Sequence, residues 1–341
     1  MKNINAALIG FAGMGQRQYK ALQLLGINVV AICDWDIDKI KKSVPGFPEG
    51  RIYKDYKDIF TKEKIDLICI ATNGPTHHEI VIESAKHGVK HIFCEKPMTT
   101  SLAKAGETID ICGASNFRLS VNHIRRWSVN HLKIKEIIKE GVIGDVRHIY
   151  FHCGCVGLGN MASHFFDMMR FIFESEPEWV VGFIDKTGTK NPRGAHFIDP
   201  GGYGIIKFKN GARGFVDTSE DTGVQYVYDI VGSCGRIRVD ELNNDWEIRA
   251  RDKKDKELPF TRYGTAMPVV PFESHGQWDI IDLTRRGIEE LVSDKKISCT
   301  GEDGYRSLEM VIAFHISDDK GNKLVYLPLK GNDLVKDIPI T

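Results

Sequence analysis

The chain has 341 residues, more than one hydrophobic core usually serves, so two domains are expected. Its 42% apolar and 27% charged residues are typical of a globular protein, and its 46 basic residues balance its 46 acidic ones. This balance argues against a nucleic-acid or membrane-surface partner, because neither would be attracted. Apolar runs stay below the roughly 18 residues of a membrane span. The first ten residues are typical of a strand and not of a signal peptide, which predicts a cytoplasmic protein.

The chain begins with a short buried strand over residues 4–9, followed by a glycine-rich turn and a helix over 16–25. The turn has the sequence Gly10-Phe11-Ala12-Gly13-Met14-Gly15. A strand, a glycine turn and a helix N-terminus can hold a pyrophosphate through backbone N–H groups. The dinucleotide fingerprint G-x-G-x-x-G appears here as G-x-A-x-x-G, because Ala12 replaces the middle glycine. An ordinary strand-to-helix turn is the alternative.

The next strand, over residues 29–33, ends in Asp34, which lies 24 positions after Gly10. The spacing is near the ~20 residues that separate the glycine turn from an acid that binds the ribose hydroxyls. A carboxylate there repels a 2′-phosphate, so NAD is predicted in preference to NADP. Trp35 is placed to stack beside the adenine. The alternative is that Asp34 only caps the helix expected over 36–42.

Two more apolar strands follow, each with polar residues at its end. The strand over 66–71 precedes Thr72, Asn73 and, one helix start later, His77; the strand over 91–94 precedes Glu95, Lys96 and a proline. With helices over 77–87 and 102–112 and a strand over 117–121, the pattern predicts a parallel, doubly wound sheet. Ligands bind at the carboxyl ends of such strands, where Lys96 can exchange a proton with a substrate. Alternatively, Lys96 is a surface residue paired with Glu95.

These motifs resemble one family of oxidoreductases. The run Ala71-Thr72-Asn73, then His77-x-Glu79, then Gly88-Val89-Lys90-His91-Ile92-Phe93-Cys94-Glu95-Lys96-Pro97 resembles the glucose-fructose oxidoreductase, inositol dehydrogenase and MocA (Gfo/Idh/MocA) family. The resemblance extends through Arg125-Arg126, residues 140–147 and Gly301-Glu302-Asp303-Gly304, and therefore covers nearly the whole chain.

The resemblance implies an NAD-binding Rossmann domain over residues 1–122. It also implies an α+β domain over 123–341, with a large, open, mostly antiparallel sheet that binds substrate and joins subunits into a homodimer or homotetramer. The implied activity is hydride transfer between a nicotinamide cofactor and a hydroxyl-bearing carbon of a sugar, cyclitol or sugar derivative.

Family members carry D-x-x-x-H-x-x-D where this chain has Asn160, His164 and Asp167. The three residues follow at i, i+4 and i+7, which places them on one face of a helix. Asn160 can position a hydroxyl but cannot accept a proton as a carboxylate does. The acid/base roles therefore fall to Lys96 and His164, and Asp167 is expected to orient His164. The alternative for His164 is a buried structural histidine at a helix start.

The rest of the chain alternates strands and turns. Strands are expected over 146–153, 179–184, 203–208, 212–217, 226–231, 236–239, 246–250 and 324–327, with helices over 127–139, 275–292 and 302–316. Four features could reach the substrate. They are the loop over 191–199 with Asn191, Pro192, Arg193, Gly194, Ala195 and His196, the loop over 259–271 with Tyr263 and Gly264, Arg125, and Arg126. Both arginines are equally well explained as structural.

The predicted site consists of three groups. The catalytic group is Lys96, His164 and Asn160, and the substrate-binding group adds Arg125 to these three. The cofactor-binding group consists of the turn and the strand ends: Gly10, Phe11, Ala12, Gly13, Met14, Gly15, Asp34, Trp35, Thr72, Asn73, His77, Glu95 and Lys96. No metal site is predicted, because Cys153 and Cys155 lack the spacing of a zinc or redox pair.

Two other functions remain open. One is a glycoside-cleaving enzyme that uses NAD for a transient oxidation. The other is a non-catalytic dinucleotide-binding sensor. This alternative is consistent with Asn160, which stands where family members have a catalytic Asp.

Overall fold

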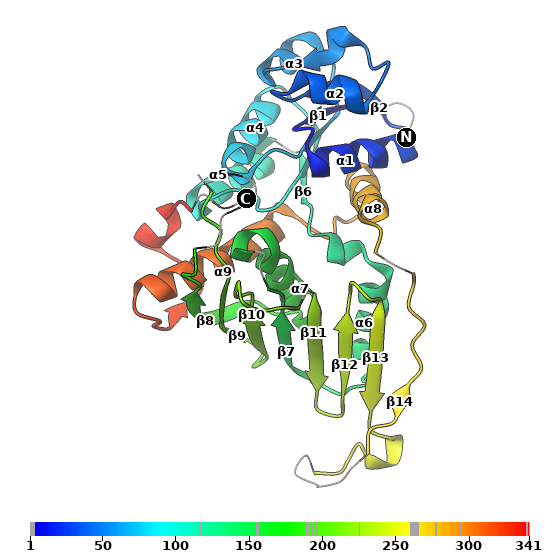
Figure 1. Ribbon diagram of the computed structural model, residues 1–341, viewed down its shortest axis with the longest axis vertical. Coiled ribbons are helices and arrows are strands. Elements are labelled where there is room, and N and C mark those ends of the chain that lie inside the picture. Colours follow the sequence, from blue (N-terminus) through cyan, green and yellow to red (C-terminus); the bar gives the residue numbers. More distant parts are fainter. Residues whose placement is uncertain are drawn as a thin grey trace. The chain divides into compact units, whose positions relative to one another are not determined.

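The structure is a computed structural model that describes residues 4–115, 117–154, 157–188, 191, 194, 197–224, 226–259, 266–276, 278–293, 295–338 and 340 (Figure 1). Within these residues, no helix has both the length and the hydropathy that a membrane crossing requires.

The chain folds into two compact units. Unit 1 comprises Met1–Trp127, Asp279–Leu308 and Leu334–Thr341, and unit 2 comprises Ser128–Trp278 and Glu309–Asp333. The sequence predicted a single boundary after residue 122, whereas the contacts of the structure assign two later segments to unit 1.

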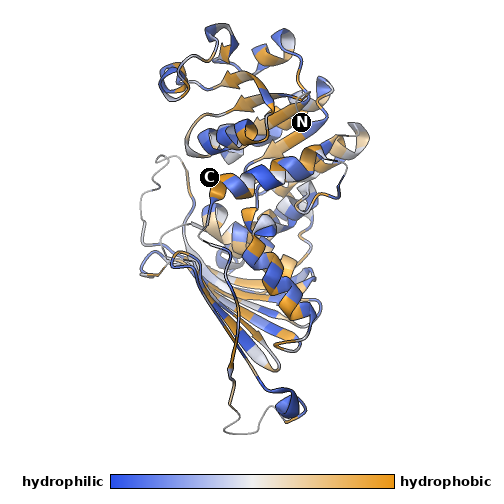
Figure 2. Ribbon diagram, turned by 90° about the vertical axis from the view of Figure 1, so that its right-hand side faces the viewer, coloured by the Kyte–Doolittle hydropathy of each residue, from blue (hydrophilic) through white to orange (hydrophobic). Residues whose placement is uncertain are grey.

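Unit 1 is built on a six-stranded parallel sheet with the strand order β3-β2-β1-β4-β5-β6. The strands are β1 (Asn5–Ile9), β2 (Asn28–Cys33), β3 (Ile52–Tyr53), β4 (Leu67–Ile70), β5 (His91–Cys94) and β6 (Arg118–Val121). All four residues of β4 are fully buried, and Figure 2 shows the strands of this sheet as hydrophobic. The predicted doubly wound parallel sheet is confirmed.

The helices of unit 1 are α1 (Gly13–Leu24), α2 (Ile37–Ser43), α3 (Lys57–Lys62), α4 (Gly74–Lys86), α5 (Leu102–Ser115) and α8 (Ile280–Val292), with short turns η1 (Glu49–Arg51) and η2 (Ile124–Trp127). Although α8 comes late in the chain, it packs against α1, β5, β6 and η2 (Figure 1). The sequence therefore returns to complete the core of its first unit.

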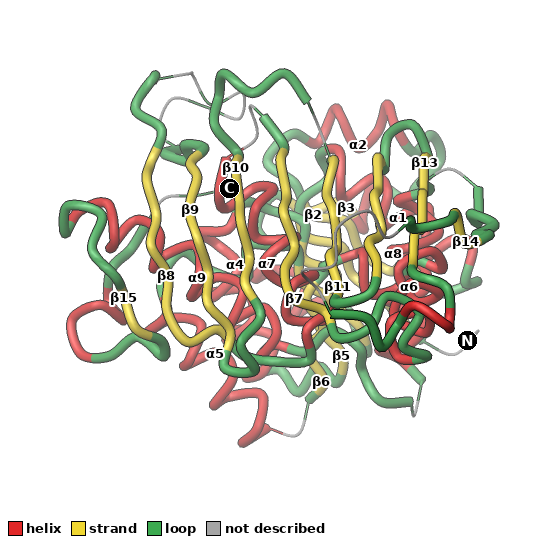
Figure 3. The backbone as a smooth tube through the Cα atoms, turned by 90° about the horizontal axis from the view of Figure 1, so that it is seen from below, coloured by secondary structure: helices red, strands yellow, loops and turns green. Residues whose placement is uncertain are grey.

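Unit 2 is built on a nine-stranded sheet with the order β14-β13-β12-β11-β7-β10-β9-β8-β15 (Figure 3). The pair β10 and β7 is parallel, and the other pairs are antiparallel, which confirms the predicted mostly antiparallel sheet. The strands are β7 (Val146–His152), β8 (Pro177–Ile184), β9 (Gly202–Phe208), β10 (Arg213–Asp217), β11 (Val227–Gly232), β12 (Gly235–Asp240), β13 (Asp245–Ala250), β14 (Val269–Val270) and β15 (Val325–Tyr326).

The helical elements that lie wholly in unit 2 are α6 (Val129–Lys139), the π-helical turn η3 (Gly157–Ala162), α7 (Ser163–Phe173) and η4 (Lys253–Asp255). Two further elements, α9 (Gly301–Asp319) and η5 (Gly331–Val335), belong partly to each unit. Alternate residues of the sheet are buried, as Ile149 and Phe151 show in β7, while Tyr150 between them is 41% exposed. One face of the sheet therefore forms the core, and the other carries exposed side chains.

Candidate functional site

The glycine turn after β1 is held by close backbone contacts. Gly10 has a φ of +92°, and a Cβ there would approach the backbone of Ala71 and Thr72 to 2.6 Å. A Cβ on Gly15 would collide with the carbonyl oxygen of Gly10, whereas one on Gly13 would meet no heavy atom within 4 Å. Gly10 and Gly15 are thus required by packing.

The first turn of α1 offers backbone N–H groups for an anion. Ala12 is the N-cap residue and makes no side-chain capping bond, and its carbonyl accepts the N–H of Gln16 at 3.0 Å. Uncapped N–H groups and the helix dipole favour a phosphate at such a position. With the open space at Gly13, the turn fits the pyrophosphate of a dinucleotide.

Asp34 connects the end of β2 to the glycine turn. Its carboxylate accepts the backbone N–H of Phe11 at 2.6 Å and that of Asp36 at 2.9 Å. The N-cap of α2 is Asp36, which accepts the N–H of Lys39 at 3.0 Å. Asp34 therefore lies beside the turn, as a ribose-binding acid must, and is not the helix cap. Trp35 is 84% exposed.

Residues after β4 are linked to those after β5 by His77. Thr72 is partly exposed and Asn73 is exposed, but His77 is fully buried. One ring nitrogen of His77 lies 2.9 Å from the carbonyl oxygen of Pro97, and the other lies 3.0 Å from that of Thr72. Burial lowers the pKa of His77, although both carbonyl contacts oppose this effect. The His77 ring thus connects the segment that follows β4 to the segment that follows β5.

Glu95 and Lys96 follow β5 directly and differ in exposure. Glu95 is 5% exposed, and its Oε1 accepts the side-chain amide of Gln18 at 2.8 Å and that of Asn122 at 2.7 Å. Burial raises the pKa of Glu95, while Asn122, Lys96 and Gln18 act against that rise. Lys96 is partly exposed at the same edge of the parallel sheet as the glycine turn and Asp34.

In unit 2, Asn160 lies in the π-helical turn η3, and His164 lies in the first turn of α7. The i, i+4 spacing predicted one continuous helix for both, but the α-helix begins only at Ser163. Asp199 accepts the backbone N–H groups of Gly159 and Asn160, both at 2.7 Å. Asp199 ends the loop over 191–199 that was expected to reach the substrate. Its contacts with this turn were not predicted, because it lies about 40 residues away with no local motif. His164 is buried, at 7% exposure.

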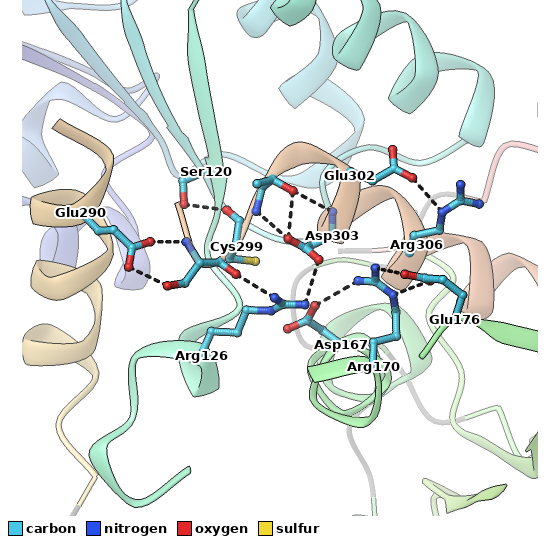
Figure 4. Close-up of polar contacts among 12 residues, drawn as sticks. Ser120, Arg126, Asp167, Arg170, Glu176, Glu290, Cys299, Glu302, Asp303 and Arg306 are labelled. Atoms are coloured by element: carbon cyan, nitrogen blue, oxygen red, sulfur yellow. Dashed lines mark hydrogen bonds and ion pairs between the residues drawn. The ribbon is translucent and has the colours of Figure 1, made fainter. Parts of the chain in front are cut away.

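Asp167 and Arg126 each have charged or polar partners within their own unit. Asp167 is fully buried in α7 and lies 3.7 Å from the guanidinium of Arg170, which also binds Glu176 in unit 2 (Figure 4). In unit 1, the guanidinium of Arg126 donates to the carbonyl of Ser298 at 2.7 Å and to Asp303 at 2.9 Å (Figure 4). These contacts favour the structural interpretation of Arg126. Arg125 is 4% exposed.

Several expected loop residues lie outside the described parts of the chain. They are Cys155, Pro192, Arg193, Ala195, His196, Tyr263 and Gly264. Of the loop over 259–271, Val269 and Val270 form β14, which pairs with β13 at the edge of the sheet. Within the described residues, no group of three His, Cys, Asp or Glu side chains is arranged to hold a metal ion.

Comparison with known families gives two matches that together span most of the chain. Residues 4–123 match the model described as "Oxidoreductase family, NAD-binding Rossmann fold". Residues 135–327 match the model described as "Oxidoreductase family, C-terminal alpha/beta domain".

Individual relatives are similar over nearly their whole length. A myo-inositol 2-dehydrogenase of Thermotoga maritima is 24% identical, covering 88% of this chain and 92% of the relative. A D-apiose dehydrogenase of Paraburkholderia graminis is 23% identical, covering 94% and 89%. The crystal structure of an oxidoreductase from Agrobacterium radiobacter, in complex with NAD⁺, L-tartaric acid and magnesium, has a TM-score of 0.76 at 22% identity, covering 95% of this chain and 98% of that one.

Proposed function

This chain belongs to the oxidoreductase family with an NAD-binding Rossmann fold (Gfo/Idh/MocA), and from that membership we propose that it oxidises a hydroxyl-bearing carbon of a sugar, cyclitol or sugar derivative. The observation that carries the proposal is the position of Lys96. It lies two residues after the end of β5, at the same sheet edge as the glycine turn and Asp34, where a Rossmann sheet binds its ligands.

The dinucleotide would be held by the glycine turn and by the strand ends of unit 1. Backbone N–H groups at Gly13 and Met14 would face the pyrophosphate, and Asp34 would accept hydrogen bonds from the ribose hydroxyls. A 2′-phosphate would be repelled by Asp34, so NAD is the proposed cofactor in preference to NADP. The bound nicotinamide would supply the hydride acceptor.

The proton chemistry is assigned to Lys96 and His164. Oxidation of an alcohol requires a group that takes the hydroxyl proton as the carbon becomes a carbonyl. An amine and an imidazole can both do so near neutral pH when their surroundings favour the neutral form. Asn160 would position a substrate hydroxyl through its amide, and Arg125 remains a proposed substrate-binding residue.

The proposed substrate class comes from the relatives. The proteins from Thermotoga maritima and Paraburkholderia graminis are named for a cyclitol and a pentose, which are both small polyols. Recognition of a polyol relies on a few well-placed hydrogen bonds, and Asn160, His164 and Lys96 all offer them.

We also propose that the enzyme works as a homodimer or homotetramer in the cytoplasm. The exposed face of the nine-stranded sheet supports the assembly, because Tyr150, Tyr203, Ile205 and Tyr326 on its strands are 40% to 69% exposed. Large apolar and aromatic side chains gathered on one sheet face are typical of subunit interfaces.

The first experiment is an assay of free sugars, cyclitols and nucleotide sugars for reduction of NAD and of NADP. We expect NADH formation with at least one polyol, and a slower reaction with NADP at the same concentration. Cleavage of a glycoside without net NADH would instead support the transient-oxidation enzyme. Tight NAD binding with no turnover of any compound would support the sensor.

The roles of Lys96 and His164 are then tested by single-turnover hydride transfer. Lys96→Ala and His164→Ala should each slow the hydride step by about 10²-fold or more, because each removes a proton acceptor. Lys90→Ala, an exposed lysine just before β5, is the control and should leave the rate unchanged. A wild-type rate in either test variant would remove that residue from the mechanism.

A further inference from the structure

A late stretch of the chain, residues 336–338 and 340, belongs to unit 1 and is called here the return segment. Its two isoleucines, Ile338 and Ile340, are both buried, whereas Asp337 is exposed. None of these residues lies in one of the six strands of the parallel sheet. The return segment therefore does not extend the sheet, and its buried side chains pack against other parts of unit 1.

The return segment is bonded to the residues that lead from β5 into α5. The N–H of Ile338 donates to the carbonyl of Thr100 at 3.0 Å. The amine of Lys104, in the first turn of α5, lies 2.6 Å from the carboxylate of Asp337. Thr100 itself is buried. A backbone hydrogen bond and an ion pair thus fix the stretch that follows Lys96.

The return segment also reaches the start of α4. A Cβ on Gly74, the first residue of this helix, would lie 3.1 Å from Cγ of Pro97 and 3.2 Å from the carbonyl oxygen of Ile340. Such distances are tighter than ordinary van der Waals contact, so glycine allows the three backbones to approach closely. The segment after β4, the segment after β5 and the return segment therefore meet at Gly74.

The same two strand-end segments are joined by the ring of His77, which lies between the carbonyls of Thr72 and Pro97. They carry three residues of the proposed cofactor site, namely Thr72, Asn73 and Lys96. His77 and the return segment thus both restrain the backbone that presents these residues. Because Ile338 and Ile340 are buried, they act through that backbone and not by contact with a ligand.

Restraint of this kind matters for binding. Loops outside regular strands and helices open locally at a lower free energy than the core does. A ligand that has to order such loops loses affinity, because part of the binding free energy offsets the lost conformational freedom. Loops that are already ordered in the free protein avoid this loss.

We infer that Ile338 and Ile340 are positioning residues of the proposed dinucleotide site. By covering the segments that follow β4 and β5, they hold the backbone of Asn73 and Lys96 in the conformation that receives the cofactor. The inference deepens the proposed function and rests on it for the identity of the ligand.

The first test is hydrogen–deuterium exchange of the NAD-free protein. It compares Ile340→Ala with Ile59→Ala, since Ile59 in α3 is also fully buried and both variants lose the same side-chain atoms. We expect exchange at residues 72–77 and 98–101 to speed up by about tenfold in Ile340→Ala and to stay unchanged in Ile59→Ala. Ile340→Val keeps most of the buried side chain and should exchange like the wild type.

The second test is calorimetric titration of each protein with NAD in the absence of substrate. Ile338→Ala and Ile340→Ala should each raise the Kd by about five- to tenfold, because binding must then order the loosened segments. Ile59→Ala, measured well below its Tm, should bind NAD like the wild type. A loss of global stability is common to all three variants, so only a positioning role separates them.

Wild-type exchange at both segments in a folded Ile340→Ala protein would overturn the inference, and so would wild-type NAD affinity in a variant whose segments have loosened. If Ile340→Ala does not fold, Gly74→Ala replaces it, because its Cβ must displace Pro97 or the Ile340 carbonyl. Unchanged exchange in that variant would equally overturn the inference. Failure of the wild-type protein to bind NAD would instead contradict the proposed function, and the exchange data would still decide whether the return segment holds the two loops.

Discussion

Asp199 stabilises the turn that carries Asn160 through two short bonds to backbone N–H groups. Hydrogen bonds to a charged acceptor contribute more than neutral ones, roughly 1.5–3 kcal/mol each. A π-helical turn leaves its backbone groups less well paired than an α-helix does, so it needs such outside support. Asp199 thus helps to fix both Asn160 and the start of the helix that carries His164.

We expect Asp199→Ala to loosen this turn and to lower kcat/KM by at least about tenfold, equivalent to about 1.4 kcal/mol. The direct measurement is hydrogen–deuterium exchange, which should speed up for the amides of Gly159 and Asn160. Asp221→Ala, at an exposed position of the same unit, is the control. Unchanged exchange in the turn would show that Asp199 does not support it.

At the scale of single residues, the sequence predicted the features of the site that depend on short spacings along the chain. The glycine turn and the distance to Asp34 are fixed by the chain itself, and the structure places them together. That His77 and Glu95 bind the cofactor stays a prediction. Their hydrogen bonds to other parts of the protein are ones that the sequence could not reveal. The partners of Glu95 come from α1 and from the end of β6, and only the fold brings these together.

The helix α8 shows how one small residue permits close packing between elements. A Cβ on Gly287 would approach the rings of Phe93 and Trp127 to 3.0 Å, so these rings lie directly on the helix backbone. Phe93 belongs to β5, the strand that is followed directly by Glu95 and Lys96. The packing of α8 against Phe93 therefore helps to hold β5, and with it the Lys96 that follows β5, in place.

We expect Gly287→Leu to destabilise unit 1 by about 1–3 kcal/mol, because the rings must move to admit the side chain. Thermal unfolding should show a Tm several degrees lower than that of the wild type. Gly106→Ala in α5 is the matched control, since a Cβ there meets no heavy atom within 4 Å. That control should be neutral or slightly stabilising, by about 0.5–1 kcal/mol. Equal Tm values for both variants would contradict the packing argument.

At the scale of elements, long periodic segments were predicted well and short ones were not. Strands such as β8 and β9 carry enough residues to show alternation, and their predicted ranges match closely. The strands β3 and β14 have two residues each, too few for any period to appear. The π-helical turn η3 was missed because its spacing resembles that of an α-helix.

The nine-stranded sheet carries a continuous row of outward side chains across its strands. Val181 pairs with Ile205, Ile205 with Phe215, and Phe215 with Tyr150, in the registers of β8, β9, β10 and β7. The row continues to Asp229 in β11, where the surface becomes charged. An apolar row with a charged end suits a self-complementary subunit interface.

We expect Ile205→Lys to dissociate the proposed homo-oligomer, because it places an amine in the middle of this row. Analytical ultracentrifugation should show a lower mass than for the wild type at the same concentration. Leu24→Lys is the matched control, since Leu24 is 68% exposed at the end of α1. A mass that Ile205→Lys leaves unchanged would place any subunit contact elsewhere.

The return of residues 279–308 to unit 1 has a consequence for how the protein is made. A ribosome finishes β1 to β6 well before it synthesises α8 and the segment that pairs beside β6, where Val121 donates to the carbonyl of Cys299. Until then, the nascent chain exposes the apolar surfaces of α1, β5 and β6 that α8 covers. Unit 1 is thus completed only after residues 279–308 have been made, and a chain that stops before them lacks the helix that covers α1, β5 and β6.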